Sequence, residues 1–526
     1  MALVILLAAA LRCRVLDAPL QRDEGEYAYG GQLLLDSVPP YAELYNMKLP
    51  GMYAAYAAVM ASLGDTAQGI HLGLLVVNAL AIVLVFAIGR RLLGDLAGFA
   101  AALVFASTSI VRGVQGVFAN AEHFLLVPVL AGVFVLLRDG ASNRRRSIAG
   151  AGLLFGIGIL LKQHGAVFAV FGAFWIGWTA LRNSFPFARI AASIGVFSIA
   201  VATPVAVTAL LLVAAGVFDA FWLWTVEYAW AYTGHMDLAG GFSLLGIYGS
   251  VVRRSAPALF GLAALGIVAI GFDAHLRGRA VFLLAFLGFS VAAVALGLNF
   301  RPHYFLLVLP AVSLLAGGVV DALARALAGR TGRAAGTAIA SAVVVGASVA
   351  TVLADPIAQR EITPDHMTRV TFGYRNPFAE SRRIADFITR LADDGDRIAV
   401  FGSEPQICFY ARIRCATGIV YMYPLMEDHV LAGDMQSTMI DEIESADPEW
   451  FVYADVPESW LDSSRFKAIT KHGSAVMRWF EQRRRSLDRV FVVELDPTGP
   501  RYLAGPSLRG HRSTPNSSVV VYRRSR

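Results

Sequence analysis

The chain has 526 residues, of which 56% are apolar or aromatic and only 16% are charged. Ordinary soluble domains have about 25% charged residues, so a typical soluble enzyme is excluded, and so much apolar surface also excludes an intrinsically disordered chain. Three cysteines are too few for a disulfide framework. Much of the net charge of +6 belongs to short loops between apolar runs, which is typical of membrane topology signals rather than of nucleic-acid binding.

A succession of apolar runs fills the chain up to about residue 355. Because an apolar helix needs about 20 residues to cross a bilayer, these runs predict about eleven transmembrane helices. We interpret the first run, which is short, as a span rather than a signal peptide, because no small-residue cleavage site precedes the acidic segment that follows. The predicted spans are 2–16, 70–89, 97–111, 120–137, two short spans within 148–181, 190–215, 256–272, 280–298, 303–320 and 334–354.

Arginines in the short loops predict the orientation of these spans. With a cytoplasmic N-terminus, the basic loops at 90–91, 144–146 and 277–279 all lie on the cytoplasmic side, as the positive-inside rule requires. We therefore expect a multi-pass protein of the inner (plasma) membrane. The loop 17–69 and everything beyond residue 370 then face the periplasm or the cell exterior.

Beyond about residue 370 the composition is that of a soluble protein. Strand-like segments alternate with helix-like segments there, which favours a small α/β sandwich without a phosphate-binding glycine loop. The sequence thus predicts a mainly α membrane domain at 1–355 and an exoplasmic α/β domain at 370–526. The expected strands are 397–403, 418–423, 450–454, 490–495 and 518–523, with helices at 378–391, from Glu404 and at 434–445.

Two cysteines of the C-terminal domain, Cys408 and Cys415, lie close enough in sequence to form a disulfide if their segment faces an oxidising compartment. We expect two buried thiols instead.

Ionisable residues near the expected exoplasmic ends of the spans are functional candidates, because a charge in hydrocarbon costs several kcal/mol. They come from several spans, which predicts one polar site at that membrane face. The segment after the first span is the most informative, since a carboxylate in Asp23-Glu24-Gly25-Glu26 is either a general base or part of a solvated loop. Lys48 is equally ambiguous, because a lysine at a helix end often extends toward the lipid headgroups.

Several of these motifs resemble the polytopic GT-C glycosyltransferases, above all the group that contains the protein O-mannosyltransferases of glycosyltransferase family 39 and the bacterial aminoarabinose transferase of lipid A. The resemblance covers roughly residues 1–355. The motifs that carry it are Asp23-Glu24 after the first span, Lys48-Leu49-Pro50-Gly51, Asn120-Ala121-Glu122-His123, Gly158 to Gln163, and Arg301-Pro302-His303-Tyr304.

The resemblance implies that Asp23 is the catalytic carboxylate, Glu24 its partner and Glu122 a second acidic residue of the site. It implies that the phosphate of a polyprenyl-phosphate sugar donor is bound by Lys48, Lys162, Arg301 and Tyr304. Further possible substrate contacts are Glu26, Tyr27, His123, Gln163, His164 and His303. Glu26 and Met47 stand where the aminoarabinose transferase has an arginine and a glutamate, so the sugar and the metal of that enzyme are not assumed.

The residue types suit the transfer of a hexosyl or pentosyl group to an acceptor hydroxyl. A carboxylate accepts the proton of the hydroxyl, cations stabilise the departing phosphate, and a single displacement inverts the anomeric carbon. His71, His123 and His303 suggest a divalent metal together with Glu122, but histidines at helix ends are more often hydrogen-bonding partners, so we expect no required metal. The acceptor is a protein, lipid A, or an O-antigen, capsule or cell-wall glycan.

A secondary transporter or flippase of a lipid-linked glycan is the alternative function. Transporters typically carry ionisable groups near the membrane midplane on interrupted helices. Here the polar groups collect at one face, which favours the enzyme.

Overall fold

The computed structural model describes residues 1–139, 145–233, 236–461 and 473–525. Contacts divide the chain into two compact units, and each is composed of three segments. Unit 1 comprises Met1–Leu16, His71–Leu210 and Asp237–Ile362. Unit 2 comprises Asp17–Ile70, Leu211–Met236 and Thr363–Arg526. The predicted loop at 17–69 therefore packs with the C-terminal segment. Arg144, one of the basic residues of the predicted cytoplasmic loops, lies outside the described residues.

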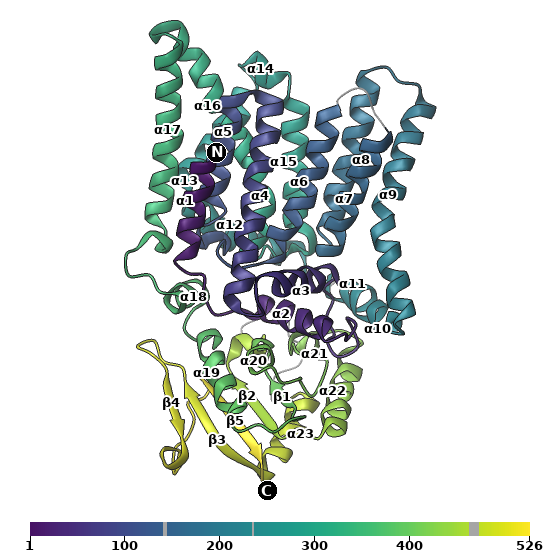
Figure 1. The fold of residues 1–526 in the computed structure, drawn as a ribbon, viewed down its shortest axis with the longest axis vertical. Coiled ribbons are helices and arrows are strands. Elements are labelled where there is room, and N and C mark those ends of the chain that lie inside the picture. The colour runs from purple at the N-terminus through teal and green to yellow at the C-terminus, as the bar shows by residue number, and fades with distance from the viewer. Residues whose placement is uncertain (140–144, 234–235, 462–472, 526) are drawn as a thin grey trace. The chain divides into compact units, whose positions relative to one another are not determined.

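Unit 1 is a bundle of long apolar helices (Figure 1). In hydrocarbon every backbone N–H and C=O must be bonded within the chain, so an apolar run of membrane length folds as a helix. Each of the eleven predicted spans overlaps a helix. The helices are α1 Ala2–Cys13, α4 Ala67–Leu93, α5 Asp95–Thr108, α6 Ala121–Asp139, α7 Arg145–Leu161, α8 Gly165–Arg182, α9 Phe187–Ala214, α12 Leu238–Ser255, α13 Pro257–Ala269, α14 Ala274–Arg277, α15 Ala280–Ala295, α16 Leu309–Thr331 and α17 Arg333–Ala354.

Seven helices in the described part of the chain are long and apolar enough to cross a membrane. The pair α12 and α13, bent by 101° at its break, makes an eighth span if it is counted as one. α1 and α5 are apolar but shorter. The fold is therefore that of a mainly α, multi-pass membrane protein, as predicted.

The short connections η1 Arg112–Val114, η4 Leu296–Leu298, η5 Pro302–Val308 and η6 Pro356–Ala358 complete unit 1. α16 is its central helix, and it approaches α5 closely through Gly317. A Cβ atom at Gly317 would lie 2.3 Å from the carbonyl oxygen of Ala97, so only glycine permits this approach. Small residues at helix contacts are the usual way in which membrane helices pack.

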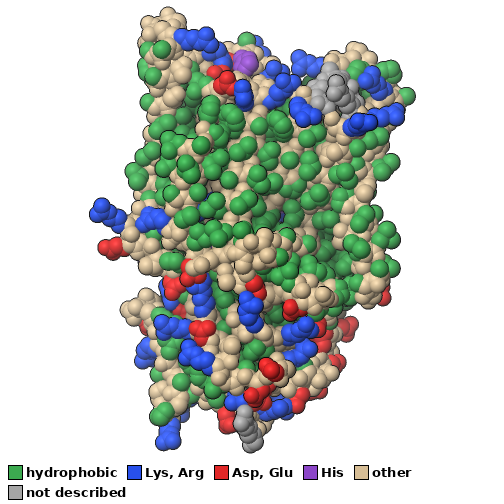
Figure 2. All heavy atoms as spheres, viewed as in Figure 1, with side chains coloured by type: hydrophobic (Ala, Val, Ile, Leu, Met, Phe, Trp, Pro, Cys, Tyr) green, Lys and Arg blue, Asp and Glu red, His purple; other side chains and the backbone are tan. Residues whose placement is uncertain are grey.

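Basic loops gather at one end of unit 1. Arg279 donates to the carbonyl of Leu92 (3.1 Å), and Arg325 pairs with Asp273 (2.9 Å). Arg91 donates to the carbonyl of Arg138 (3.3 Å). Figure 2 shows Lys and Arg side chains at the end that carries α14, and apolar side chains over the long helices on the visible face. The described residues Arg91, Arg279 and Arg325, all near predicted cytoplasmic loops, thus lie at one end of the bundle.

Unit 2 contains a five-stranded mixed sheet in the order β1-β2-β5-β3-β4. β1 is parallel to β2, and the other pairs are antiparallel. The strands are β1 Ile398–Phe401, β2 Trp450–Asp455, β3 Leu487–Glu494, β4 Arg501–Ala504 and β5 Ser518–Arg524. The helices are α2 Arg22–Leu35, α3 Gly51–Leu63, α10 Phe218–Trp222, the π-helix η3 Leu223–Tyr228, α11 Ala229–Thr233, α18 Pro364–Phe372, α19 Phe378–Thr389, α20 Gln406–Ala411, α21 Tyr423–Met426, α22 Ala432–Ala446 and α23 Ala475–Arg483.

Helices pack against both faces of this sheet. Phe480 of α23 stacks on Phe401 with ring centroids 4.2 Å apart, and Phe387 of α19 stacks on Phe491 at 4.5 Å. Trp224 and Tyr228 of the π-helix belong to the same buried cluster as Phe480. The predicted α/β class of the C-terminal segment is confirmed.

One predicted strand is wrong, and one strand was not predicted. Residues 418–423 form no strand, because their backbone groups bond elsewhere: the carbonyl of Gly418 accepts from the N–H of Tyr45 (2.7 Å), and the N–H of Met422 donates to Ser403 Oγ (2.9 Å). β4 is a short, partly exposed edge strand that the sequence pattern did not predict.

The expectation of two buried thiols is also wrong, since Cys408 and Cys415 form a disulfide. The left-handed conformation of Arg412 ends α20 and turns the chain back, which brings the two Cα atoms to 5.9 Å. Disulfides are typical of oxidising compartments.

Candidate active site

Most of the residues singled out by the sequence lie in two clusters, one in each unit, together with residues that the sequence did not single out. The Asp23 cluster in unit 2 consists of Asp23, Glu26, Lys48, Tyr53 and Tyr421. The Glu122 cluster in unit 1 consists of Glu122, Lys162, His164, His303 and Tyr304. Each cluster is described by itself.

A capping box places Asp23 in the first turn of α2. The side chain of Gln21 accepts from the N–H of Asp23 (2.8 Å), and the carboxylate of Glu24 accepts from the N–H of Gln21 (3.0 Å). Acidic residues are favourable there because they satisfy free N–H groups and face the positive end of the helix dipole. Glu24 is fully buried and caps the helix, so it holds the backbone under Asp23.

Arg22, the preceding residue, anchors the start of α2 to the C-terminal segment. Its guanidinium pairs with Glu404 (2.6 Å) and donates to the carbonyl of Ser403 and to the hydroxyl of Tyr423 (3.1 Å). Gly25 permits α2 to lie directly on α20, since a Cβ atom at this position would come within 2.7 Å of Gln406 Cβ. The start of α2 is therefore fixed by contacts on both sides of Asp23.

Lys48 lies between two carboxylates. Its Nζ is 2.6 Å from Asp23 Oδ1 and 2.7 Å from Glu26 Oε2. It also lies over the rings of Tyr27 and Tyr421, at 4.5 and 4.9 Å from their centroids. A partly buried ammonium is stabilised by this combination of charge and aromatic faces.

Glu26 is completely buried, whereas the Asp23 side chain is 29% exposed. Besides Lys48, Glu26 accepts hydrogen bonds from Tyr53 Oη (2.8 Å) and from Asn46 Nδ2 (2.9 Å). Protein groups thus occupy both oxygens of Glu26. Asp23 is the carboxylate of the pair that solvent or a substrate can reach.

The charges of this cluster are coupled. Burial raises the pKa of Glu26, and the favourable charge of Lys48 only partly opposes it. Burial disfavours the charged form of Lys48. The attraction of the Asp23 and Glu26 carboxylates is stronger than this effect, so the pKa of Lys48 is raised. Lys48 is therefore positively charged at neutral pH, and two carboxylates share its single charge.

Tyr421 completes the Asp23 cluster and was not found from the sequence. Its hydroxyl donates to Asp23 Oδ1 at 2.9 Å and lies 3.5 Å from Lys48 Nζ. Tyr53 and Asn46 were missed as well. Asn46 could have been predicted from its place beside Lys48 in one short loop. No local sequence pattern marks Tyr421.

The Glu122 cluster joins the start of α6, the end of α7 and η5. Lys162, directly after α7, pairs with Glu122 Oε1, and its Nζ lies 4.2 Å from the centroid of the Tyr304 ring. His303 Nε2 is 4.0 Å from the same Glu122 oxygen. The rings of His164 and His303 both contact the Tyr304 ring edge to face, with centroids 4.9 Å apart.

Polar atoms remain available in this cluster. Neither ring nitrogen of the buried His164 has a hydrogen-bond partner among the described residues, and within the same set Glu122 Oε2 has none. Because buried polar atoms are normally paired, they mark a place for water or a ligand group.

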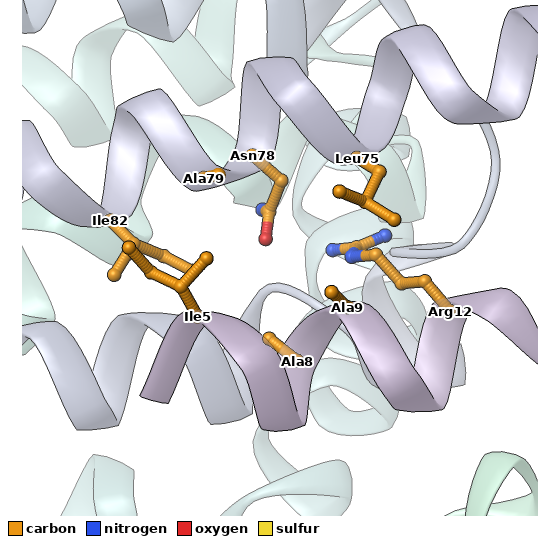
Figure 3. A pocket seen from close by; sticks show the side chains of 8 residues that line it. All are labelled: Ile5, Ala8, Ala9, Arg12, Leu75, Asn78, Ala79 and Ile82. Atoms are coloured by element: carbon orange, nitrogen blue, oxygen red, sulfur yellow. The ribbon is translucent and has the colours of Figure 1, made fainter. Parts of the chain in front are cut away.

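Gln115 holds His303 and was not predicted. Its Oε1 lies 2.9 Å from His303 Nδ1, and its backbone is left-handed (φ 54°). Arg12 of α1 supports the same turn, because its guanidinium donates to the carbonyls of Ser109 (2.9 Å) and Gly116. Figure 3 shows Arg12 and Asn78 facing a small pocket between α1 and α4. The buried Arg12 therefore has a structural role.

The remaining predicted residues lie near these groups in sequence. Arg301 is half-buried and directly precedes η5, Gln163 lies between Lys162 and His164, and His123 is buried beside Glu122 in α6. Tyr27 packs on Lys48, as described above. Within the described ranges no three His, Cys, Asp or Glu side chains are placed to hold a metal ion.

Comparisons with known proteins agree with the fold. Residues 48–207 match the family model described as dolichyl-phosphate-mannose-protein mannosyltransferase, a range that begins at Lys48 and includes Glu122 and Lys162. No curated protein sequence matches the chain.

Solved structures that resemble the chain over nearly its whole length include the following two. ArnT from Cupriavidus metallidurans, bound to undecaprenyl phosphate, is 14% identical, with 99% of this chain and 97% of that chain covered and a TM-score of 0.58. The oligosaccharyltransferase AglB from Archaeoglobus fulgidus, in complex with an inhibitory peptide and a dolichol-phosphate, is 13% identical, with 96% and 74% covered and a TM-score of 0.51. The chain therefore has the fold of the polytopic GT-C glycosyltransferases and resembles ArnT and the dolichyl-phosphate-mannose-protein mannosyltransferases.

Proposed function

We propose that the chain is a membrane glycosyltransferase that moves a sugar from a polyprenyl-phosphate donor to an acceptor hydroxyl. The observation that carries this proposal is the Asp23–Lys48 pair. It combines a partly exposed carboxylate with a positive charge in a chain of GT-C fold. The lipid phosphates bound by ArnT and AglB support the class of donor.

Asp23 is the general base of the proposed reaction. The oxygen of the acceptor hydroxyl attacks the anomeric carbon, and its proton passes to the Asp23 carboxylate. The bond between the anomeric carbon and the phosphate oxygen breaks, and its electron pair leaves with the polyprenyl phosphate. The sugar is thereby transferred with inversion, and a base of this kind contributes about 10²- to 10⁴-fold to the rate.

Lys48, Lys162, Arg301 and Tyr304 bind the donor phosphate in this proposal. Cations at the leaving group are effective because negative charge grows on the phosphate as the bond breaks. Lys162 suits the role, because its ion pair with Glu122 holds it in place. Its neighbours His164 and Glu122 also carry polar atoms that have no hydrogen-bond partner among the described residues, so the surroundings of Lys162 have room for a ligand group. Glu122 acts as the second acidic residue, which orients Lys162 through their ion pair.

The orientation of the enzyme belongs to the same proposal. The N-terminus lies in the cytoplasm, and the C-terminal segment faces the periplasm or the cell exterior. The disulfide of Cys408 and Cys415 supports this orientation, because thiols of the cytoplasm are kept reduced.

Asp23→Asn tests the proposal. With a panel of polyprenyl-phosphate sugars and candidate acceptors, we expect kcat to fall by at least about 10²-fold because the amide cannot accept the proton. Asp36→Asn is the matched control, since Asp36 is exposed at the other end of the same helix. Transfer by Asp23→Asn at the rate of the unmodified protein would contradict the assignment of the base.

A further inference from the structure

Tyr421 is the one member of the Asp23 cluster that the C-terminal segment provides. It lies 398 positions from Asp23 in sequence and is 6% exposed, and its hydroxyl donates a hydrogen bond to Asp23 Oδ1. Lys48 contacts the same oxygen, and its ammonium faces the ring of Tyr421. One tyrosine therefore contacts both members of the proposed catalytic pair.

The backbone around Tyr421 is held in place. The N–H of Met422 donates to Ser403 Oγ, and this hydroxyl donates to the carbonyl of Ser459 (2.8 Å). Both serines are fully buried. On the other side of Tyr421, Gly418 is bonded to Tyr45 through the backbone. A side chain on such a fixed segment can orient a neighbouring group with little reorganisation.

We propose that Tyr421 is a positioning residue for the base, so that the C-terminal segment helps to prepare the carboxylate of Asp23 for proton abstraction. This inference rests on the proposed function of Asp23. Two donors on Oδ1 fix the rotation of the carboxylate. A hydrogen bond of this kind favours the ionised form of a carboxylate over the protonated form.

Other titratable groups surround the pair of Asp23 and Tyr421, and they remain when only the hydroxyl is removed. Lys48 pairs with Asp23 from the loop before α3, Glu26 and Arg22 lie on the same helix as Asp23, Tyr56 faces Asp23 from α3, and Tyr423 neighbours Tyr421. Tyr421→Phe keeps the ring over Lys48 and the contact with Tyr423. The variant therefore removes only the contacts of the hydroxyl, which are the bond to Asp23 and the longer contact with Lys48 Nζ.

The experiment compares kcat, KM and pH profiles of Tyr421→Phe and Tyr45→Phe. Tyr45 is the matched control, because its hydroxyl donates to the carbonyl of Ala42 and its ring stacks on Trp224. Loss of a hydrogen bond to a charged group predicts a fall in kcat of about 10- to 100-fold for Tyr421→Phe. We expect the KM for the donor to change little, and the acidic limb of kcat/KM to move to higher pH because the pKa of Asp23 rises.

Incorporation of 3-fluorotyrosine at position 421 gives a readout that does not depend on deleting a group. The fluorinated hydroxyl is a stronger donor of nearly the same size, so the acidic limb should move in the opposite direction, to lower pH. A variant that only disturbed folding would lower activity without moving the limb in either direction.

The outcomes separate this inference from the proposed function. If Asp23→Asn is inactive while Tyr421→Phe keeps the unmodified kcat and pH profile, the role of Tyr421 is wrong and the role of Asp23 stands. If Asp23→Asn keeps full transfer, the proposed function itself fails. An acidic limb that 3-fluorotyrosine leaves unmoved also contradicts the role of Tyr421.

Discussion

The balance of charge around Lys48 decides what single substitutions in the Asp23 cluster do. One ammonium compensates two carboxylates, one of them fully buried. Removing the cation leaves two negative groups near each other in a poorly solvated place. Removing the buried carboxylate leaves a balanced pair of Lys48 and Asp23. The two changes therefore differ in their effect on stability.

We predict that Lys48→Met lowers the free energy of unfolding by about 3 kcal/mol, the cost of leaving a buried charge without its partner. Glu26→Gln, which keeps the size of the side chain, should cost much less, and the double variant should recover most of the loss. Thermal unfolding of the purified protein measures these differences. Additive losses in the double variant would show that charge coupling is not the cause.

Lys162 gives the corresponding prediction for donor binding. Lys162→Met should raise the KM for the polyprenyl-phosphate sugar by about 10-fold or more, since a charge-assisted contact to phosphate contributes about 1.5–3 kcal/mol. Arg189→Met is a control, because the Arg189 guanidinium rests on the Phe185 ring. An unchanged KM for Lys162→Met would remove this lysine from the phosphate site.

The sequence predicted the residues whose chemistry is marked by local motifs. Asp23 and Lys48 are 25 positions apart and were recognised together, and the structure pairs them. Tyr421 and Gln115 lacked such a signal, because a tyrosine or a glutamine acquires its role only through the partner that folding brings to it. Glu24 was recognised through its place beside Asp23, and its carboxylate also caps the helix that carries Asp23.

Secondary-structure elements were predictable where a single physical constraint dominates. Hydrocarbon forces an apolar run of sufficient length into a helix, so composition alone located the spans. The segment 418–423 has β-forming residues, but its hydrogen bonds go to Tyr45 and Ser403, two distant positions. Contacts of this kind override local propensity and are invisible in a window of sequence.

The contact between α2 and α20 gives a prediction at the scale of elements. Gly25→Ala should lower the free energy of unfolding by about 1–3 kcal/mol, because the added Cβ meets the backbone of Gln406 at 2.8 Å. Gly150→Ala in α7, where nothing lies within 4 Å, should instead be neutral or slightly stabilising, since alanine is the better helix former. Equal effects of the two substitutions would contradict this packing argument.

At the scale of the whole molecule, composition predicted two domains that follow one another along the chain, at 1–355 and 370–526. The contacts group three separate segments of the chain into each unit. Such interleaving depends on long-range packing that composition does not contain.

The disulfide allows a test of the orientation of the whole molecule. Protein from cells that are quenched in acid and denatured should take up one N-ethylmaleimide, at Cys13, and three after reduction, since the chain has 3 cysteines. Mass spectrometry counts the adducts. Three adducts without reduction would place the C-terminal segment in a reducing compartment.

The position of β5 has a consequence for the timing of biosynthesis. β5 follows the other strands in the chain, yet it lies in the middle of the sheet, between β2 and β3. During translation, the segment that supports Asp23 therefore stays unfinished until residues 518–524 have left the ribosome, long after the apolar helices have been inserted. A nascent chain held in the membrane would thus carry its apolar helices while its proposed base is still unprepared, so the proposed reaction could not begin before residues 518–524 are made.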